Sequence, residues 1–341
     1  MNMNAMPRVT LAFLSWNRLH YLRATLESAR ECIRYPNLEW IVSDNESIEP
    51  GLREYVESRD WIQHKWFKRQ SHAAAMNEMM ERATGDFILI WPEDVQFTVR
   101  GDWMIDLVEL LTEHQWLGSI CLDYMRGATR EAIFHPNPLE QRHRFIDECL
   151  RYKGAFRRSR IVRSSRGFAL RSFGWPKQGV CGSGIPSLTR SAVWRELGPW
   201  RTSDGPSRFI DSSLGAEDDM VMRFYESRRP LQGAIPLIPV AADLITDPTG
   251  CKAKVRGHYR YGVYMPPPEG TFYYRIRDLA EFTERADGLP LSFAEGVEPL
   301  GFRIPVDERG DRLKSQMNMS VVYDIQANQP VPYPLTVEPK R

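Results

Sequence analysis

The chain has 341 residues, with 45 Lys and Arg against 44 Asp and Glu, a formal net charge of +1. This balance, with 42% hydrophobic and 26% charged residues, is typical of a globular protein and excludes a polybasic nucleic-acid coat or an acidic disordered chain. A chain of this length can bury a core without disulfides or structural metals, in one large domain or two ordinary ones.

The first 125 residues alternate between two periodicities, which predict strands and helices in turn. The predicted strands are residues 8–14, 38–43, 61–67, 87–91 and 117–122. The predicted helices are residues 19–33, 52–56, 73–83 and 104–111. Pro36 closes the first helix, and Gly85 is expected to end the third. This alternation favours an α/β fold whose mostly parallel sheet is covered on both faces.

Polar clusters follow three of the predicted strands, at residues 15–18, 44–47 and 93–94. In open parallel sheets, ligands bind outside the carboxyl ends of the strands. We therefore expect the functional site at this edge of the sheet.

The middle of the chain differs in charge from the rest. From Cys149 to Arg195 there is no Asp or Glu, while Lys and Arg recur throughout. Residues 185–188 predict a strand, and Ser191 is expected to cap the helix that follows it. After the proline run at 266–268 the pattern weakens, which indicates a C-terminal extension packed on the core and ending in a loose tail.

The five cysteines are dispersed without a Cys-x-x-Cys pair, so they predict neither a disulfide framework nor a zinc knuckle. No run reaches the roughly 18 apolar residues that a membrane span needs. The first apolar run, residues 9–14, is too short for a signal peptide. We expect a cytoplasmic protein without an integral membrane segment, and peripheral contact with a membrane stays open.

The order of the polar clusters carries a resemblance to a known family. Ser15-Trp16-Asn17-Arg18 comes first, then Asp44-Asn45-Glu46-Ser47, then Asn77 ahead of Ala83-Thr84-Gly85-Asp86, then Glu93-Asp94, and last Glu217-Asp218 with Arg223. Over about residues 7–265 this resembles the family 2 glycosyltransferases of GT-A fold. The resemblance implies a Rossmann-like, mostly parallel sheet flanked by helices. It also implies a nucleotide-sugar-binding half at 1–125, an acceptor and catalytic half at 126–265, and a C-terminal extension at 266–341.

The resemblance implies a nucleotide-sugar donor, with a UDP-sugar as the first candidate. The implied donor-binding residues are Ser15, Asn17, Arg18, Asp44, Asn45, Asn77 and Glu93. Asp44 would accept the ring N–H of the nucleobase. The alternative for Asp44 and Asn45 is an ordinary Asx turn, in which the side chain bonds its own backbone.

The resemblance also implies a divalent cation, Mn²⁺ or Mg²⁺, on Asp94, with His258 completing the metal site. Such a cation would neutralise the departing diphosphate. Pro92 stands where the family has a further carboxylate, which leaves metal dependence open. Asp94 as a capping carboxylate and His258 as a structural histidine are the alternatives.

In the family the late acidic pair performs the transfer, which is inverting. The resemblance therefore makes Asp218 the general base that takes the proton of the acceptor hydroxyl, with Glu217 contacting the acceptor. Neutralisation of a helix dipole or a salt bridge to Arg223 are alternative roles for these acids.

The basic segment 151–171 predicts contact with an anionic acceptor. Five arginines are closely spaced in it: Arg157, Arg158, Arg160, Arg163 and Arg166. We expect a mobile loop whose charges act together rather than through one defined ion pair. The acceptor would be a glycan, a lipid-linked sugar or a nucleic acid, and the alternative is a solvated arginine-rich face.

Two other functions stay open. A sugar-nucleotide nucleotidyltransferase would carry a Gly-rich loop after the first strand, where this chain has residues 15–18. A catalytically inactive GT-A module that binds carbohydrate or nucleic acid would fit the altered metal motif, although Glu217 and Asp218 are both present.

Overall fold

The structure is a computed structural model of residues 1–341. It describes residues 6–16, 19–93, 95–122, 159–172, 186–202, 231–243 and 271–288, with short pieces at 220, 223, 259–260, 290–291, 293–298, 300, 322–324 and 329–331.

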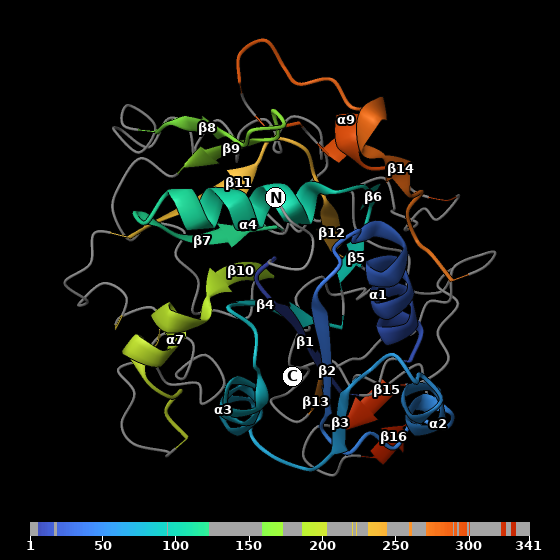
Figure 1. Ribbon diagram of the computed structural model, residues 1–341. Helices are drawn as coiled ribbons and strands as arrows, with labels where there is room; N and C mark the ends of the chain where they lie inside the picture. The colour runs from blue at the N-terminus through green and yellow to red at the C-terminus, as the bar shows by residue number, and fades with distance from the viewer. Residues whose placement is uncertain are drawn as a thin grey trace, which may run out of the picture.

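One large mixed sheet organises the described part of the chain (Figure 1). Its nine strands run in the order β3-β2-β1-β4-β10-β7-β11-β9-β8. Their bounds are β1 Val9–Ser15, β2 Leu38–Asp44, β3 His64–Phe67, β4 Phe87–Pro92, β7 Leu117–Cys121, β8 Ile161–Arg163, β9 Ala169–Ser172, β10 Ser187–Arg190 and β11 Gln232–Pro236. Strands β3, β2, β1 and β4 are mutually parallel, whereas β10 runs antiparallel between β4 and β7. The α/β class with a largely parallel sheet is confirmed.

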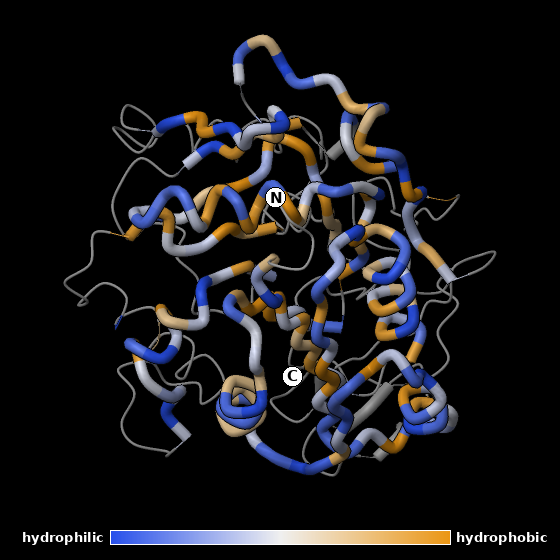
Figure 2. Tube along the Cα trace, viewed as in Figure 1, coloured by the Kyte–Doolittle hydropathy of each residue, from blue (hydrophilic) through white to orange (hydrophobic). Residues whose placement is uncertain are grey.

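Helices cover both faces of this sheet, as the alternating pattern predicts. The helices are α1 Leu19–Cys32, α2 Leu52–Glu57, α3 His72–Arg82, α4 Trp103–Glu113, α7 Ser191–Leu197 and the short α9 Phe293–Gly296. Alternate residues of β1 divide the core: Leu11 and Phe13 pack with α1, α2 and α4, whereas Ala12 packs with α3 and α7. Hydrophobic residues accordingly concentrate in the sheet and on the inner helix faces (Figure 2).

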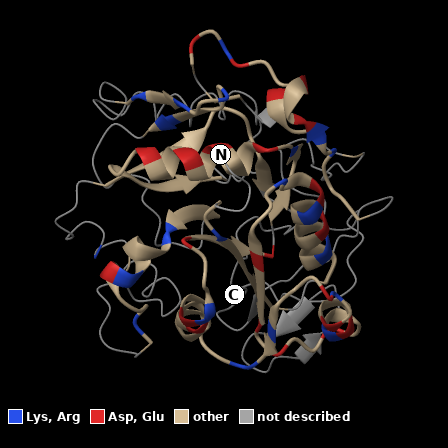
Figure 3. Ribbon diagram, viewed as in Figure 1, with Lys and Arg blue, Asp and Glu red and all other residues tan. Residues whose placement is uncertain are grey.

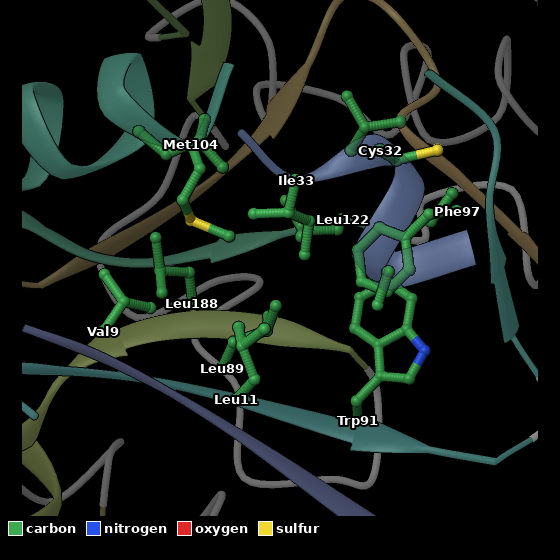
Figure 4. Close-up of a cluster of buried hydrophobic side chains, with 14 of the residues drawn as sticks. Val9, Leu11, Cys32, Ile33, Leu89, Trp91, Phe97, Met104, Leu122 and Leu188 are labelled. Carbon is green, nitrogen blue, oxygen red and sulfur yellow. The ribbon is translucent and has the colours of Figure 1, made fainter. Parts of the chain in front are cut away.

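The larger core holds a row of stacked aromatic side chains. The Phe97 ring lies 4.0 Å from the Trp91 ring and 6.0 Å from the Trp103 ring, centroid to centroid. The indole N–H groups of Trp91 and Trp103 donate to the carbonyls of Val95 and Val99 at 2.9 and 2.8 Å, so burial leaves neither polar group unpaired. Figure 4 shows Trp91 and Phe97 beside Cys32 and Ile33 of the same cluster.

Two local predictions are wrong. Ser191 does not cap α7: the hydroxyl donates to the carbonyl of Gly85, and Arg190 occupies the N-cap position. Gly85 does not end α3, whose C-cap is Ala83. Gly85 instead allows close approach, because a Cβ there would lie 2.6 Å from the hydroxyl oxygen of Thr10.

Small strands near the sheet join distant parts of the chain. They are β5 Val95–Phe97, β6 Val99–Arg100, β12 Ala241–Asp243 and β14 Arg277–Asp278, with β13 Tyr259–Arg260, β15 Val322–Asp324 and β16 Gln329–Val331 in a separate sheet. β12 pairs with β5, and β14 pairs with β6. The amide of buried Gln96 accepts from the backbone N–H groups of Tyr273 and Tyr274 and donates to the Tyr274 carbonyl. Residues 271–278 are thereby fixed to the region after β4.

The described helices are all too short or too polar to cross a lipid bilayer.

Candidate functional site

The carboxyl ends of β1, β2 and β4 meet at one edge of the sheet. In the parallel register Ser15 lies opposite Asp44, and Leu14 lies opposite Pro92. The edge therefore brings together Ser15, Asp44, Asn45 and Glu93, four of the residues that the sequence predicts to bind the donor. Asn17 and Arg18, from the same turn as Ser15, lie outside the described residues.

Asp44 is fully buried and holds the turn that follows β2. Its carboxylate accepts from the Ser47 backbone N–H at 2.7 Å and from the Ser47 hydroxyl at 2.5 Å. Burial raises the pKa of Asp44, and the bonds from Ser47 act against that rise. The Asx-turn alternative is thus present in the structure. Contact with a nucleobase would have to share a carboxylate that is already bonded on both oxygens.

Asn45 connects three strand ends. Its backbone N–H donates to the carbonyl of Ser15 at 2.8 Å, and its side-chain oxygen accepts from the backbone N–H of Gln70 at 2.7 Å. The ends of β1 and β2 and the segment after β3 are thereby held in one arrangement. Asn45 therefore shapes the edge, whether or not it also contacts a ligand.

A cation–aromatic pair that the sequence does not predict lies at this edge. The Arg69 guanidinium lies over the Trp16 ring, 5.4 Å from its centroid. Trp16 directly follows β1, and Arg69 comes two residues after β3 ends. Only the position of Trp16 inside a predicted site turn could have drawn attention to it; nothing in the sequence pairs it with Arg69.

The described residues do not by themselves form a metal centre. Within the described ranges, no three His, Cys, Asp or Glu side chains gather closely enough to hold a metal ion. Glu93 is 5% exposed, and its carbonyl accepts from the Thr25 hydroxyl at 2.7 Å, which fixes the turn to α1. Asp94 and His258, the predicted ligands, lie outside the described residues.

Asn77 has a role that the sequence does not indicate. Both ends of its amide are bonded to the backbone of Trp200, whose carbonyl accepts at 2.8 Å and whose N–H donates at 2.7 Å. A direct bond to the donor would require breaking one of these contacts. The structure therefore makes Asn77 a link between α3 and the segment after α7.

The neighbours of the predicted catalytic acids are partly described. Glu217 and Asp218 lie outside the described residues, but Met220 is fully buried in the cluster with Met76 and Trp200. Further along, Arg223 donates to the carbonyl of Leu197 at 2.9 Å. Met220 therefore packs against α3 and Trp200, and Arg223 is bonded to the end of α7.

The basic segment is a hairpin with defined ion pairs, so the expectation of a mobile loop is wrong for its described part. Arg166 forms a two-point ion pair with Asp106 of α4 at 2.8 and 3.0 Å. Arg163 likewise binds both oxygens of Glu284, at 2.7 and 3.0 Å. Arg160 lies over the Trp116 ring at 5.6 Å. Arg160 precedes β8, Arg163 ends it and Arg166 lies in the turn before β9, and the hairpin brings each to a partner far away in sequence.

Arg157 and Arg158, the other two arginines of the segment, lie outside the described residues. A role for them in acceptor binding stays a prediction.

The comparisons with known proteins agree with the motif order. Residues 12–161 match the model of the family described as glycosyl transferase family 2. The resemblance to this family is thus confirmed over the part of the chain that holds β1 to β7. No protein of curated function matches the chain.

Two solved structures give the scale of the structural likeness. A mannosyltransferase from Pyrobaculum calidifontis, solved with GDP-Man and Mn²⁺, is 15% identical over 72% of this chain, at a TM-score of 0.44. TarS from S. aureus is 14% identical over 67% of this chain, at a TM-score of 0.41. This chain covers 59% of the first protein and 35% of the second.

Proposed function

We propose that this chain is a glycosyltransferase that moves a sugar from a nucleoside-diphosphate sugar to an acceptor hydroxyl. The observation that carries the proposal is the family 2 match over residues 12–161, on a stretch whose strand ends gather the polar residues of the family pattern. The strand ends are where ligands bind in sheets of this type.

The nucleoside would lie at the edge formed by β1 and β2. Asp44 and Asn45 build its floor, and the turn with Asn17 and Arg18 would close over it. Trp16 and Arg69 offer a planar, cationic surface beside this edge. A guanidinium of this kind suits a ligand that joins an aromatic base to phosphates. A UDP-sugar is our first candidate, because the resemblance implies it.

In this proposal Asp94 and His258 would bind a divalent cation, Mn²⁺ or Mg²⁺. When bound, it would stabilise the charge of the departing diphosphate. The substitution by Pro92 removes one family carboxylate, so the response to a chelator is a necessary test of this part.

The transfer itself would depend on Asp218. Its carboxylate would take the acceptor proton as the new glycosidic bond forms on the opposite side of the anomeric carbon from the departing diphosphate, which inverts the configuration. Glu217 would contact the acceptor. The packed neighbours Met220 and Arg223 support a fixed position for this pair. The acceptor would be a glycan, a lipid-linked sugar or a nucleic acid.

The test is a thermal-shift panel of nucleoside diphosphates and nucleotide sugars, with Mn²⁺ and with chelator, followed by donor hydrolysis. A ligand at a hundred times its dissociation constant stabilises a protein by about 2.7 kcal/mol. Stabilisation with hydrolysis supports a transferase, and stabilisation without hydrolysis favours an inactive binding module. Stabilisation by nucleoside triphosphate with a sugar phosphate would favour a nucleotidyltransferase.

A further inference from the structure

A groove of about 690 Å³ runs along the outer side of α1. This side is opposite to the one that packs Leu22 and Leu26 into the core. The residues that line the groove are Arg23, Glu27, Arg30 and Glu31 of α1, Arg59 after α2, and residues 271–272. Figure 3 shows basic and acidic positions along this helix.

The two carboxylates of the groove already have partners. Glu27 forms an ion pair with Arg59 at 3.2 Å and accepts from the Tyr55 hydroxyl at 2.8 Å. Glu31 forms an ion pair with Arg100, outside the groove lining. Neither carboxylate is therefore the counter-charge of the remaining two arginines.

Arg23 and Arg30 are held in place by aromatic rings instead of by acids. Arg23 lies over the Tyr55 ring at 5.3 Å, and Arg30 lies over the Trp61 ring at 4.8 Å. Among the described residues neither guanidinium has a carboxylate partner, and Arg23 Nε is buried without a hydrogen-bond partner. Burial and then the charge of Arg23 lower the pKa of His20, one turn earlier.

The spacing of Arg23 and Arg30 indicates the length of ligand that could contact both. They lie seven positions apart on one helix face, which places their Cα atoms about 10 Å apart along the axis. Their planar guanidinium groups suit two-point bonding to oxyanions. One small anion would satisfy one arginine, whereas a chain of anionic groups would reach both.

We propose that this groove binds an extended ligand carrying several phosphate groups, with Arg23 and Arg30 each contacting one of them. The aromatic stacking orders both side chains before the ligand arrives, which reduces the entropy cost of binding. The groove requires no residue of the proposed donor site.

The test is calorimetric titration of the full chain with tripolyphosphate, a longer linear polyphosphate, inorganic phosphate and citrate at low salt, with and without UDP or GDP. We expect the longer polyphosphate to bind more tightly than inorganic phosphate or citrate, and binding to persist with the nucleotide present. Arg23→Gln and Arg30→Gln should each weaken polyphosphate binding by about tenfold, the effect of losing one charge-assisted contact.

Arg82→Gln is the matched control. Arg82 also lies over an indole, that of Trp66 at 4.5 Å, but Glu78 pairs with it at 2.7 Å. Its substitution should change polyphosphate binding by less than about twofold, because its charge is already neutralised. Absence of wild-type binding, an equal loss in Arg82→Gln, or citrate binding as tightly as polyphosphate would overturn the proposal. Unchanged nucleotide binding in Arg23→Gln and Arg30→Gln separates this result from the outcome for the donor site.

Discussion

The side-chain amide of Asn77 is bonded at both ends to the backbone of Trp200, 123 residues later in the chain. Trp200 follows α7 and packs with Met220, three residues or fewer from the predicted catalytic acids. We therefore expect Asn77 to be a positioning residue for Met220, which lies close in sequence to Glu217 and Asp218.

Asn77→Asp should test this link. The substitution keeps the acceptor for the Trp200 N–H but places a second acceptor against the Trp200 carbonyl. Loss of one bond and the new repulsion should destabilise the protein by about 1–3 kcal/mol. We expect kcat to fall more than the affinity for the donor. The measurements are denaturant unfolding and steady-state transfer kinetics; a variant with wild-type kcat and stability would contradict the role.

Asp218→Asn should abolish transfer while leaving donor binding nearly intact. The substitution removes the base and keeps the shape, and loss of a general base costs about 10² to 10⁴ in rate. Asp219→Asn, one residue further along, is the matched control and should retain turnover. Wild-type turnover of Asp218→Asn at saturating substrate would show that another group takes the proton.

Asp94→Ala should weaken donor binding in the presence of Mn²⁺ and remove its sensitivity to EDTA. The reason is that Asp94 is the predicted carboxylate ligand for the cation that clamps the diphosphate. The check is donor titration with and without chelator for both proteins. If the wild type already ignores EDTA, the clamp is not a metal, and arginine or lysine side chains become the candidates.

Arg166→Gln should destabilise the protein more than Arg163→Gln does. Arg166 pairs with Asp106, whose side chain is 2% exposed, whereas the Arg163 partner Glu284 is 26% exposed. Because the Arg166 side chain is itself 39% exposed, solvent screening limits the expected loss to about 1–2 kcal/mol. Arg163→Gln should cost up to about 1 kcal/mol. Chemical denaturation gives both values, and a larger loss for Arg163→Gln would contradict the assigned ion pairs.

Glu39 should make the free energy of unfolding decrease at acid pH. Burial acts to raise the pKa of Glu39, but bonds from the Thr10 hydroxyl and from the N–H and hydroxyl of Thr84 outweigh it, so the pKa is lowered. A lowered folded-state pKa stabilises the protein above the unfolded-state pKa of about 4.3. That contribution is lost as the pH falls through the folded-state value.

Glu39→Gln removes this contribution. Its stability deficit relative to the wild type should be largest near neutral pH and should shrink as the pH falls below about 4.3. Urea unfolding at a series of pH values measures the difference. A deficit that stays constant, or grows, on acidification would contradict the lowered pKa.

The sequence by itself predicts the layered core and the position of the site edge. The apolar runs from residue 8 to residue 122 alternate with helical spacing, and each buried strand must satisfy its backbone in a sheet. The polar turns after β1, β2 and β4 then fall at one edge, because parallel strands end on the same side. Periodicity and turn chemistry are local properties, so they can be read along the chain.

Tertiary structure decided which of these residues are already bonded to protein groups. Contacts between segments distant in sequence determine the bonds from Asn77 to Trp200, from Arg166 to Asp106 and from Gln96 to residues 273–274. They also determine that Arg190, rather than Ser191, is the N-cap residue of α7. No local pattern specifies such partners, because each requires two chain segments to arrive at a fixed distance and angle. The same cause explains why evenly spread arginines became defined ion pairs in the hairpin, whereas the groove along α1 retained two without an acid.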